Sequence, residues 1–212
     1  SAASTTYTYD PRDPVPTIGG SFTPYAQLGV PSGAFDQRED ERFHASKPPY
    51  LPLESRQDVV VFQTEPLTED VEVVGPIVVK LYAASTAVDT DFTAKLVDVY
   101  PPSRDFPKGF DMNVTDGVLR ARYRNSPSRQ ELMTPGTVYE FEIRPFTTAN
   151  VFKRGHRIRV DISSSNYPRF DLNPNTGEPL GQNRRMIPAD NTVHHSAQYS
   201  SHIIIPIVRP TT

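Results

Sequence analysis

Short stretches of alternating hydrophobic and polar residues recur along the chain from residue 58 onward. In residues 138–144 aromatic and aliphatic side chains alternate with glutamates, and in residues 156–163 aliphatic side chains alternate with arginines and an aspartate. Successive side chains of a β-strand point to opposite faces of a sheet, so this period of two predicts strands. The predicted strands are 59–62, expected to be buried on both faces, 77–84, 92–100, 117–124, 138–144, 156–163 and 203–208.

Helices are not predicted, because no 12-residue window shows a convincing helical stripe. Many short strands with proline and glycine between them favour a two-sheet antiparallel β-sandwich, and we expect a jelly roll of the galactose-binding-like kind. No internal repeat is visible. Pro206 marks the last strand as an edge or a bulge, since proline cannot donate a hydrogen bond to a sheet. The sandwich is predicted to span residues 58–212.

Residues 1–57 differ from the rest of the chain. They contain the proline-rich runs 10–16 and 47–52, which push the preceding residues toward extended geometry. We expect a long irregular lead-in rather than regular strands. Its aromatic residues include Tyr7, Tyr9, Phe22, Tyr25, Phe35 and Phe43. They argue against a free linker, so the lead-in should pack on the sandwich or on whatever precedes or follows it.

Composition excludes several classes of function. The 22 prolines among 212 residues are roughly twice the average usage, which fits short elements joined by turns. A net charge of −3 provides no strong field for nucleic acid or anionic lipid, and no stretch reaches the length of a membrane span. The absence of cysteine removes disulfides and thiolate chemistry and leaves the cellular compartment open. The first residues do not resemble a signal peptide and suggest a processed end or a cut into a longer protein.

A serine nucleophile is not indicated by the sequence. No Gly-x-Ser-x-Gly turn is present, and the serines at 163–165 end a predicted strand without a following helix. His156 starts that same strand, where a structural histidine is commoner than a general base. We therefore expect no catalytic residue in this chain.

Two segments resemble metal sites only partly. The spacing of His194, His195 and His202 matches no zinc motif, and we expect these histidines to be structural or solvent-exposed in a loop before the last strand. Asp171, Asn173 and Asn175 resemble the opening of a calcium loop, but the glycine and glutamate expected further along are missing. Such residues also stabilise ordinary turns, so calcium binding by this loop stays open. No metal or cofactor is predicted.

The arginines at 120, 122, 124, 157 and 159 could form a basic patch for nucleic acid. On strands they are expected to face outward, where Glu140, Glu142 and Asp161 offer opposite charges. A cross-strand charge ladder explains them without nucleic acid.

Several segments, in order along nearly the whole chain, resemble the C-terminal domain of the cocaine esterase and X-Pro dipeptidyl-peptidase family of serine hydrolases. Glutaryl acylases and α-amino acid ester hydrolases belong to the same group. The segments are residues 9–11, 13–20, 36–38, 64–67, 89–99, 116–117, 120–124, 135–136, 139, 150–152, 155–160, 163–166 and 175–177.

The resemblance implies a jelly roll that follows an α/β-hydrolase domain and a helical cap, with the catalytic Ser, Asp and His upstream of this chain. The implied partners are that catalytic domain and a small acyl ester, amide or peptide substrate. The lead-in of residues 1–57 is then expected to pack on the sandwich or on the missing hydrolase domain. Leu81 and Tyr82 match family positions that face the substrate pocket, although ordinary strand packing explains them equally. Loops at 25–52 and 101–110 depart from shorter members, so the substrate class does not transfer.

Two functions remain to be separated. The first is a non-catalytic domain that packs on a serine hydrolase and helps to wall its pocket. The second is a free-standing carbohydrate-binding jelly roll, which the ten tyrosines allow and the absence of tryptophan weakens. A domain separated from its hydrolase should expose a sizeable apolar surface, whereas a sugar module should expose aromatic platforms.

Overall fold

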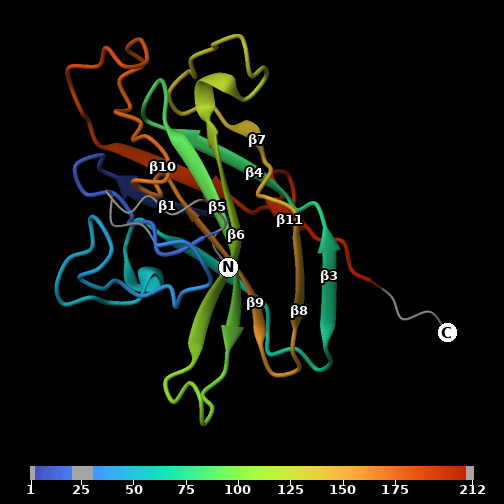
Figure 1. Ribbon diagram of the computed structural model, residues 1–212. Coiled ribbons are helices and arrows are strands. Elements are labelled where there is room, and N and C mark those ends of the chain that lie inside the picture. Colours follow the sequence, from blue (N-terminus) through green and yellow to red (C-terminus); the bar gives the residue numbers. More distant parts are fainter. Residues whose placement is uncertain (1–2, 21–30, 209–212) are drawn as a thin grey trace.

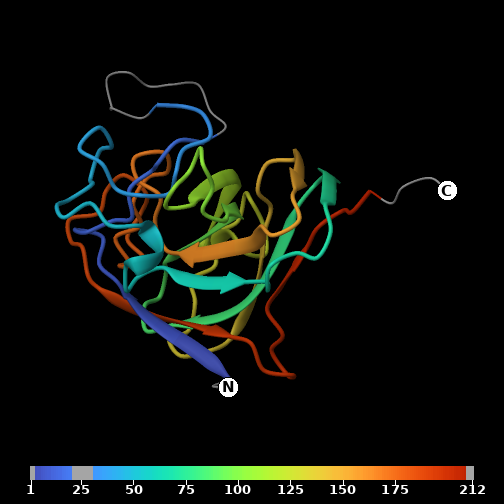
Figure 2. The ribbon, with the colours of Figure 1, turned by 90° about the horizontal axis from the view of Figure 1, so that it is seen from below.

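The structure is a computed structural model that describes residues 3–20 and 31–208. Two antiparallel sheets lie face to face (Figures 1 and 2), so the predicted all-β sandwich is confirmed, while its jelly-roll connectivity stays a prediction. One sheet has the order β1 (Ser4–Tyr9), β10 (Ala189–His194), β4 (Val78–Ser85) and β11 (His202–Ile204), and β7 (Tyr139–Ile143) pairs with the other edge of β4. The second sheet has the order β2 (Val60–Gln63), β9 (Arg157–Ser163), β5 (Asp91–Tyr100) and β6 (Phe110–Arg120).

A two-stranded ribbon of β3 (Val71–Gly75) and β8 (Thr148–Phe152) stands beside the sandwich, on the right of Figure 1. An isolated bridge joins Val73 of this ribbon to Ile207 after β11. The helical elements within residues 3–20 and 31–208 are two 3₁₀ turns, η2 (Leu53–Ser55) and η3 (Ala121–Tyr123). Within the described ranges, no helix has the length and apolarity needed to cross a bilayer.

The main hydrophobic core fills the space between the two sheets. Phe92 of β5 and Phe141 of β7 lie at its centre, with ring centroids 4.7 Å apart and no exposed surface. The inward positions of β9 are the aliphatic residues that the alternation predicts, Ile158, Val160 and Ile162. Burial of such side chains is the main favourable contribution to folding, at about 1.5–3 kcal/mol each.

After β1, residues 10–20 and 31–57 of the lead-in cover the outer face of the β2–β9–β5–β6 sheet. A second hydrophobic cluster forms there from Val15, Ile18, Phe43, Leu53 and Val59. Backbone and side-chain hydrogen bonds tie the segment to β6 and to the end of β9, for example from the Gln37 N–H to the Asp111 carbonyl oxygen (3.0 Å). Of the distinguishing loop at 25–52, residues 25–30 lie outside the described residues.

Most predicted strands appear close to their expected limits, with three differences. The segment predicted at 117–124 is the end of the longer β6, and the chain turns into η3 at residue 121. The last strand stops at Ile204, before Pro206. The expectation that 59–62 is buried on both faces is wrong, because β2 is an edge strand whose Phe62 is 37% exposed.

Four strands were not predicted: β1, β3, β8 and β10. The lead-in was expected to be irregular, yet its residues 4–9 pair with β10 along six positions. Both of these strands alternate, but the outward positions are polar residues such as Thr8 and Asp190, and the inward ones include Asn191, which is fully buried. A buried asparagine interrupts the hydrophobic pattern. The expected loop around His194 is therefore a strand.

Replacing a buried and an exposed phenylalanine by alanine tests the position of the core. Phe141→Ala is expected to lower the free energy of unfolding by about 3–5 kcal/mol, because a fully buried ring is replaced by a cavity. Phe146→Ala, at a residue that is 58% exposed, should cost less than about 1 kcal/mol. Equal losses in urea unfolding would contradict this placement of the core.

Candidate functional site

Leu81 and Tyr82, the predicted pocket residues, lie on opposite faces of β4. Leu81 is 1% exposed and belongs to the main core. Tyr82 is half-buried on the outer face of the sheet, where its Oη donates a hydrogen bond to Glu140 Oε2 (2.8 Å). Its ring centroid lies 5.8 Å from that of Tyr199. Only Tyr82 can therefore present its side chain to a partner that covers this outer face.

Charged residues surround Tyr82 on the same face. Lys80 Nζ lies 3.1 Å from Glu140 Oε1 and 3.8 Å from Glu142 Oε2. The hydrogen bond to Glu140 raises the pKa of the Tyr82 phenol, because ionisation would lose that bond and place two negative charges together. Hydrogen bonds from Tyr82 and Lys80 lower the pKa of Glu140. This face thus carries an ordered, ion-paired cluster around one tyrosine.

A buried polar network closes one end of the sandwich. Arg122 Nε donates to Asp89 Oδ2 (2.8 Å), and the Arg122 backbone N–H donates to Asp89 Oδ1 (2.9 Å). Arg120 forms a bidentate salt bridge with Asp91, in which Nε donates to Oδ1 and Nη2 donates to Oδ2, both at 2.9 Å. Burial raises the pKa of the Asp91 carboxyl, and the bonds from Arg120 oppose that shift.

These pairs correct the prediction of an outward charge ladder. The side chains of Arg122 and Arg159 are 2% and 1% exposed, and their partners are not the predicted glutamates. Arg159 does contact Asp161, but as a buried neighbour on the same strand. The Arg120–Asp91 pair could have been identified from the sequence. Pairing the two consecutive strands as a hairpin places Asp91 of β5 directly opposite Arg120 of β6.

The loop considered for calcium is held by this network. Asn173 Nδ2 donates to Asp89 Oδ2 (2.9 Å) and to Asp91 Oδ1 (2.8 Å), while its Oδ1 accepts the Asn175 N–H (2.9 Å). That last bond is the turn-forming interaction typical of asparagine. Among the described residues, no group of three or more metal-binding side chains is assembled.

The serines and His156 make structural contacts. Ser164 Oγ lies 2.8 Å from Tyr7 Oη, and Ser165 Oγ accepts the Val15 N–H (2.9 Å). His156 Nδ1 lies 2.8 Å from Asp98 Oδ1, and its ring packs on Tyr100. These contacts hold the His156 ring in place, and its structural role stays a prediction.

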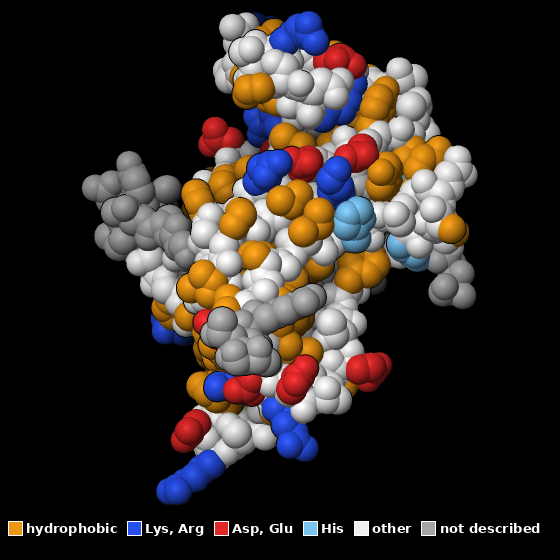
Figure 3. Space-filling view, turned by 90° about the vertical axis from the view of Figure 1, so that its right-hand side faces the viewer, with side chains coloured by type: hydrophobic (Ala, Val, Ile, Leu, Met, Phe, Trp, Pro, Cys, Tyr) orange, Lys and Arg blue, Asp and Glu red, His pale blue; other side chains and the backbone are white. Residues whose placement is uncertain are grey.

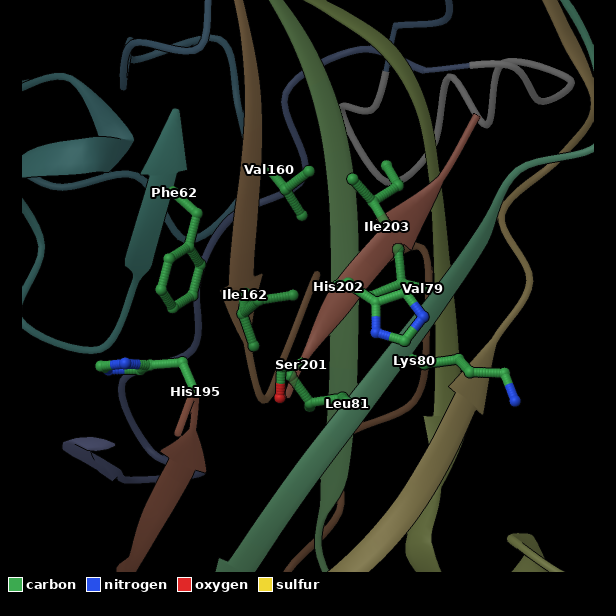
Figure 4. Close-up of a pocket in the computed structure, with 10 residues that line it drawn as sticks. All are labelled: Phe62, Val79, Lys80, Leu81, Val160, Ile162, His195, Ser201, His202 and Ile203. Atoms are coloured by element: carbon green, nitrogen blue, oxygen red, sulfur yellow. The ribbon is translucent and has the colours of Figure 1, made fainter. Parts of the chain in front are cut away.

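An apolar cavity, which the sequence did not reveal, lies between the two sheets at the edge formed by β2 and β11 (Figure 4). Its volume is about 180 Å³. Leu81 and Val79 of β4, Val160 and Ile162 of β9, and Ile203 of β11 contribute its apolar walls. Phe62 and His195 stand together at one side.

These observations define the class of the protein as a β-sandwich whose polar clusters hold loops in place. Residues 1–204 match the family of the X-Pro dipeptidyl-peptidase C-terminal non-catalytic domain. The chain belongs to this family, and the resemblance inferred from the sequence is confirmed.

Similar proteins are longer hydrolases. The chain is 41% identical over 206 residues to cocaine esterase from Rhodococcus sp. (strain MB1 Bresler), covering 96% of this chain and 32% of that protein. An aminopeptidase from the marine sediment archaeon Thaumarchaeota archaeon superposes with a TM-score of 0.81 at 30% identity, covering 99% of this chain and 34% of that one. An α-amino acid ester hydrolase gives a TM-score of 0.81 at 30% identity, with coverages of 98% and 33%. The chain therefore spans about a third of the length of these relatives.

Removing Arg122 tests the buried network. Arg122→Met is expected to lower the free energy of unfolding by about 3–5 kcal/mol, because Asp89 is left buried without its cation. Asp89→Asn in the same chain should restore part of that loss. Arg12→Met removes an arginine from an exposed pair and should change little. If urea unfolding shows the same small loss of stability for Arg122→Met and Arg12→Met, the buried network does not stabilise the fold as argued.

The phenol of Tyr82 provides a test of the outer-face cluster. In a ¹³C-tyrosine NMR titration, the pKa of Tyr82 should lie above the ordinary value of 10.0, and Glu140→Gln should lower it toward that value. Glu142→Gln is the matched control, since Glu142 contacts Lys80 rather than Tyr82. A Tyr82 pKa that Glu140→Gln leaves unchanged would show that the hydrogen bond does not form in solution.

Proposed function

We propose that this non-catalytic domain packs on an α/β-hydrolase catalytic domain of the same polypeptide and helps to wall its substrate pocket. The hydrolase would cleave acyl esters or amides through a serine nucleophile, and Xaa-Pro dipeptides are among the candidate substrates. The observation that carries the proposal is the 41% identity with cocaine esterase over 96% of this chain, which is only 32% of that protein. The names of the aminopeptidase and the α-amino acid ester hydrolase support amide and ester substrates.

Exposed hydrophobic side chains support the proposal that another domain covers part of this surface. Hydrophobic side chains gather on the face that includes the β3–β8 ribbon (Figure 3). The large hydrophobic residues that are exposed across the described chain are Leu51, Phe62, Val74, Leu132, Phe146, Val151, Leu180, Met186, Ile187, Ile204, Ile207 and Val208. Of these, Val74 and Val151 lie on the β3–β8 ribbon, and Ile207 and Val208 belong to the segment that pairs beside it. A contiguous exposed apolar patch of this kind is typical of a surface that contacts another protein.

The same residues disfavour the carbohydrate-binding alternative. Ten of the twelve are aliphatic, and aliphatic side chains offer no flat ring for a sugar to stack on. Every tyrosine in the described ranges is buried or half-buried. Among the described phenylalanines and tyrosines, only Phe62 and Phe146 are exposed, so the domain offers little of the flat aromatic surface that a sugar module needs.

In the proposed enzyme, this domain forms part of the wall of the substrate pocket and takes no part in the chemical step. Tyr82 is the candidate for direct contact with the pocket, since its side chain lies on the outer face of β4. Leu81 would support it from the core side, holding β4 against the second sheet. The contribution of both residues to the pocket stays a prediction.

The longer polypeptide tests the proposal directly. The reading frame upstream of Ser1 should encode an α/β-hydrolase with a Gly-x-Ser-x-Gly turn and later Asp and His residues. That full protein should hydrolyse aryl esters or Xaa-Pro anilides, and the 212-residue chain alone should not. A reading frame that starts near Ser1, or turnover by this chain alone, would overturn the proposal.

Tyr82 provides the test of the pocket wall in the full enzyme. Tyr82→Ala is expected to change KM or kcat several-fold, while Tyr100→Ala, at the far end of β5, should leave both values close to those of the unaltered enzyme. Matching thermal unfolding temperatures would show that the effect of Tyr82→Ala is local. Identical kinetics in the two variants would remove Tyr82 from the pocket but leave the family assignment intact.

A further inference from the structure

The apolar cavity exists because one strand of the sandwich is interrupted. β10 pairs with Tyr82–Ser85 of β4, and β11 pairs with Val78–Lys80, on the same edge. Leu81 therefore has no partner residue on that edge. The chain between β10 and β11 leaves the sheet as a small loop, closed by a bridge between His195 and Ser200. The inward side chain that a continuous strand would place beside Leu81 is missing, and the space remains open between the sheets.

Ser201 satisfies the backbone at the interruption. Its Oγ accepts the Tyr82 N–H (2.9 Å) and donates to the His194 carbonyl oxygen (2.6 Å). The hydroxyl that borders the cavity is thus already engaged with the backbone. The cavity opens to solvent on one side, but a water molecule inside it would find few free polar partners, because most of its wall is aliphatic or aromatic.

We propose that this cavity is a binding site for a small, neutral, apolar molecule about the size of a single aromatic ring. The volume is about 180 Å³, and the apolar walls come from the inward positions of both sheets. An engineered cavity of about 150 Å³ with a similar aliphatic and aromatic lining, in another protein, stays dry and binds benzene or xenon. The site does not depend on the catalytic partner proposed above.

The charges near the opening favour a neutral ligand. Lys80 directs its side chain away from the cavity (Figure 4), toward Glu140 and Glu142. His195 is already engaged, since its Nε2 lies 3.2 Å from Thr5 Oγ1 and its ring packs edge-on against Phe62. His202, which also borders the cavity, is an exposed residue whose Nδ1 lies 2.7 Å from the Ser200 carbonyl oxygen. A carboxylate on the ligand would lose hydration without gaining a cation, which is strongly unfavourable.

Crystals of the chain under xenon pressure provide the direct test. Xenon density is expected between Leu81, Ile162 and Ile203. In solution, benzene should raise the thermal unfolding temperature in proportion to the logarithm of its concentration once the site is nearly saturated. Absence of both effects would overturn the proposal.

Benzoate tests the chemical class of the ligand. At neutral pH it should bind at least about tenfold more weakly than benzene, because the site offers no partner for its charge. Benzoate binding as tight as benzene would show that the site takes acids and would overturn the inference of a neutral ligand.

A filled cavity gives the matched control. Ile203→Phe should place a ring in the cavity and abolish the stabilisation by benzene. Ile205→Phe changes a similarly half-buried residue that does not line the cavity and should retain it. Unfolding temperatures without ligand show whether each variant is folded. If neither variant folds, the xenon and benzene results on the unaltered chain decide the question. If Ile203→Phe folds and benzene still stabilises it, benzene binds at another site and the proposal is wrong.

Discussion

The buried ion pairs at the start of β5 constrain the rest of this end of the sandwich. Removing Asp89 and Arg122 from water is costly, so the pair is stable only if each of its polar atoms finds a partner. The guanidinium of Arg122 meets this demand by also donating to the Glu178 carbonyl oxygen and to Gln130 Oε1. Two long loops, far apart in sequence, are held in place because the charges beneath them require their polar groups.

The outer face of β5 imposes a similar constraint on the lead-in. Lys95 lies on this face, and burial lowers its pKa, while Asp116 and Asp161 favour its charged form. Lys95 Nζ donates to Gln37 Oε1 (2.5 Å), so a residue of the lead-in completes the cluster. The segment that looks irregular in the sequence thus removes these polar groups from water and supplies a hydrogen-bond partner in its place.

β4 connects the functional proposals because its two faces differ. Tyr82 and its charged neighbours lie on the outer face, where a partner domain could contact them. Leu81 lies on the inner face, beside the cavity that the interruption between β10 and β11 leaves open. One residue step along a strand thus separates a candidate contact with the catalytic domain from a candidate ligand site.

The sequence by itself determined the all-β class, the strands with clear alternation such as β7 and β9, and the family. Tertiary structure decided what covers each face. Arg122 and Arg159 look like surface residues in the alternation, yet loops and the lead-in bury them. The polar strands β1 and β10 pair because Asn191 finds partners in Thr90 and Ser164. Alternation specifies the side to which a residue points, whereas burial depends on distant segments that pack against that side.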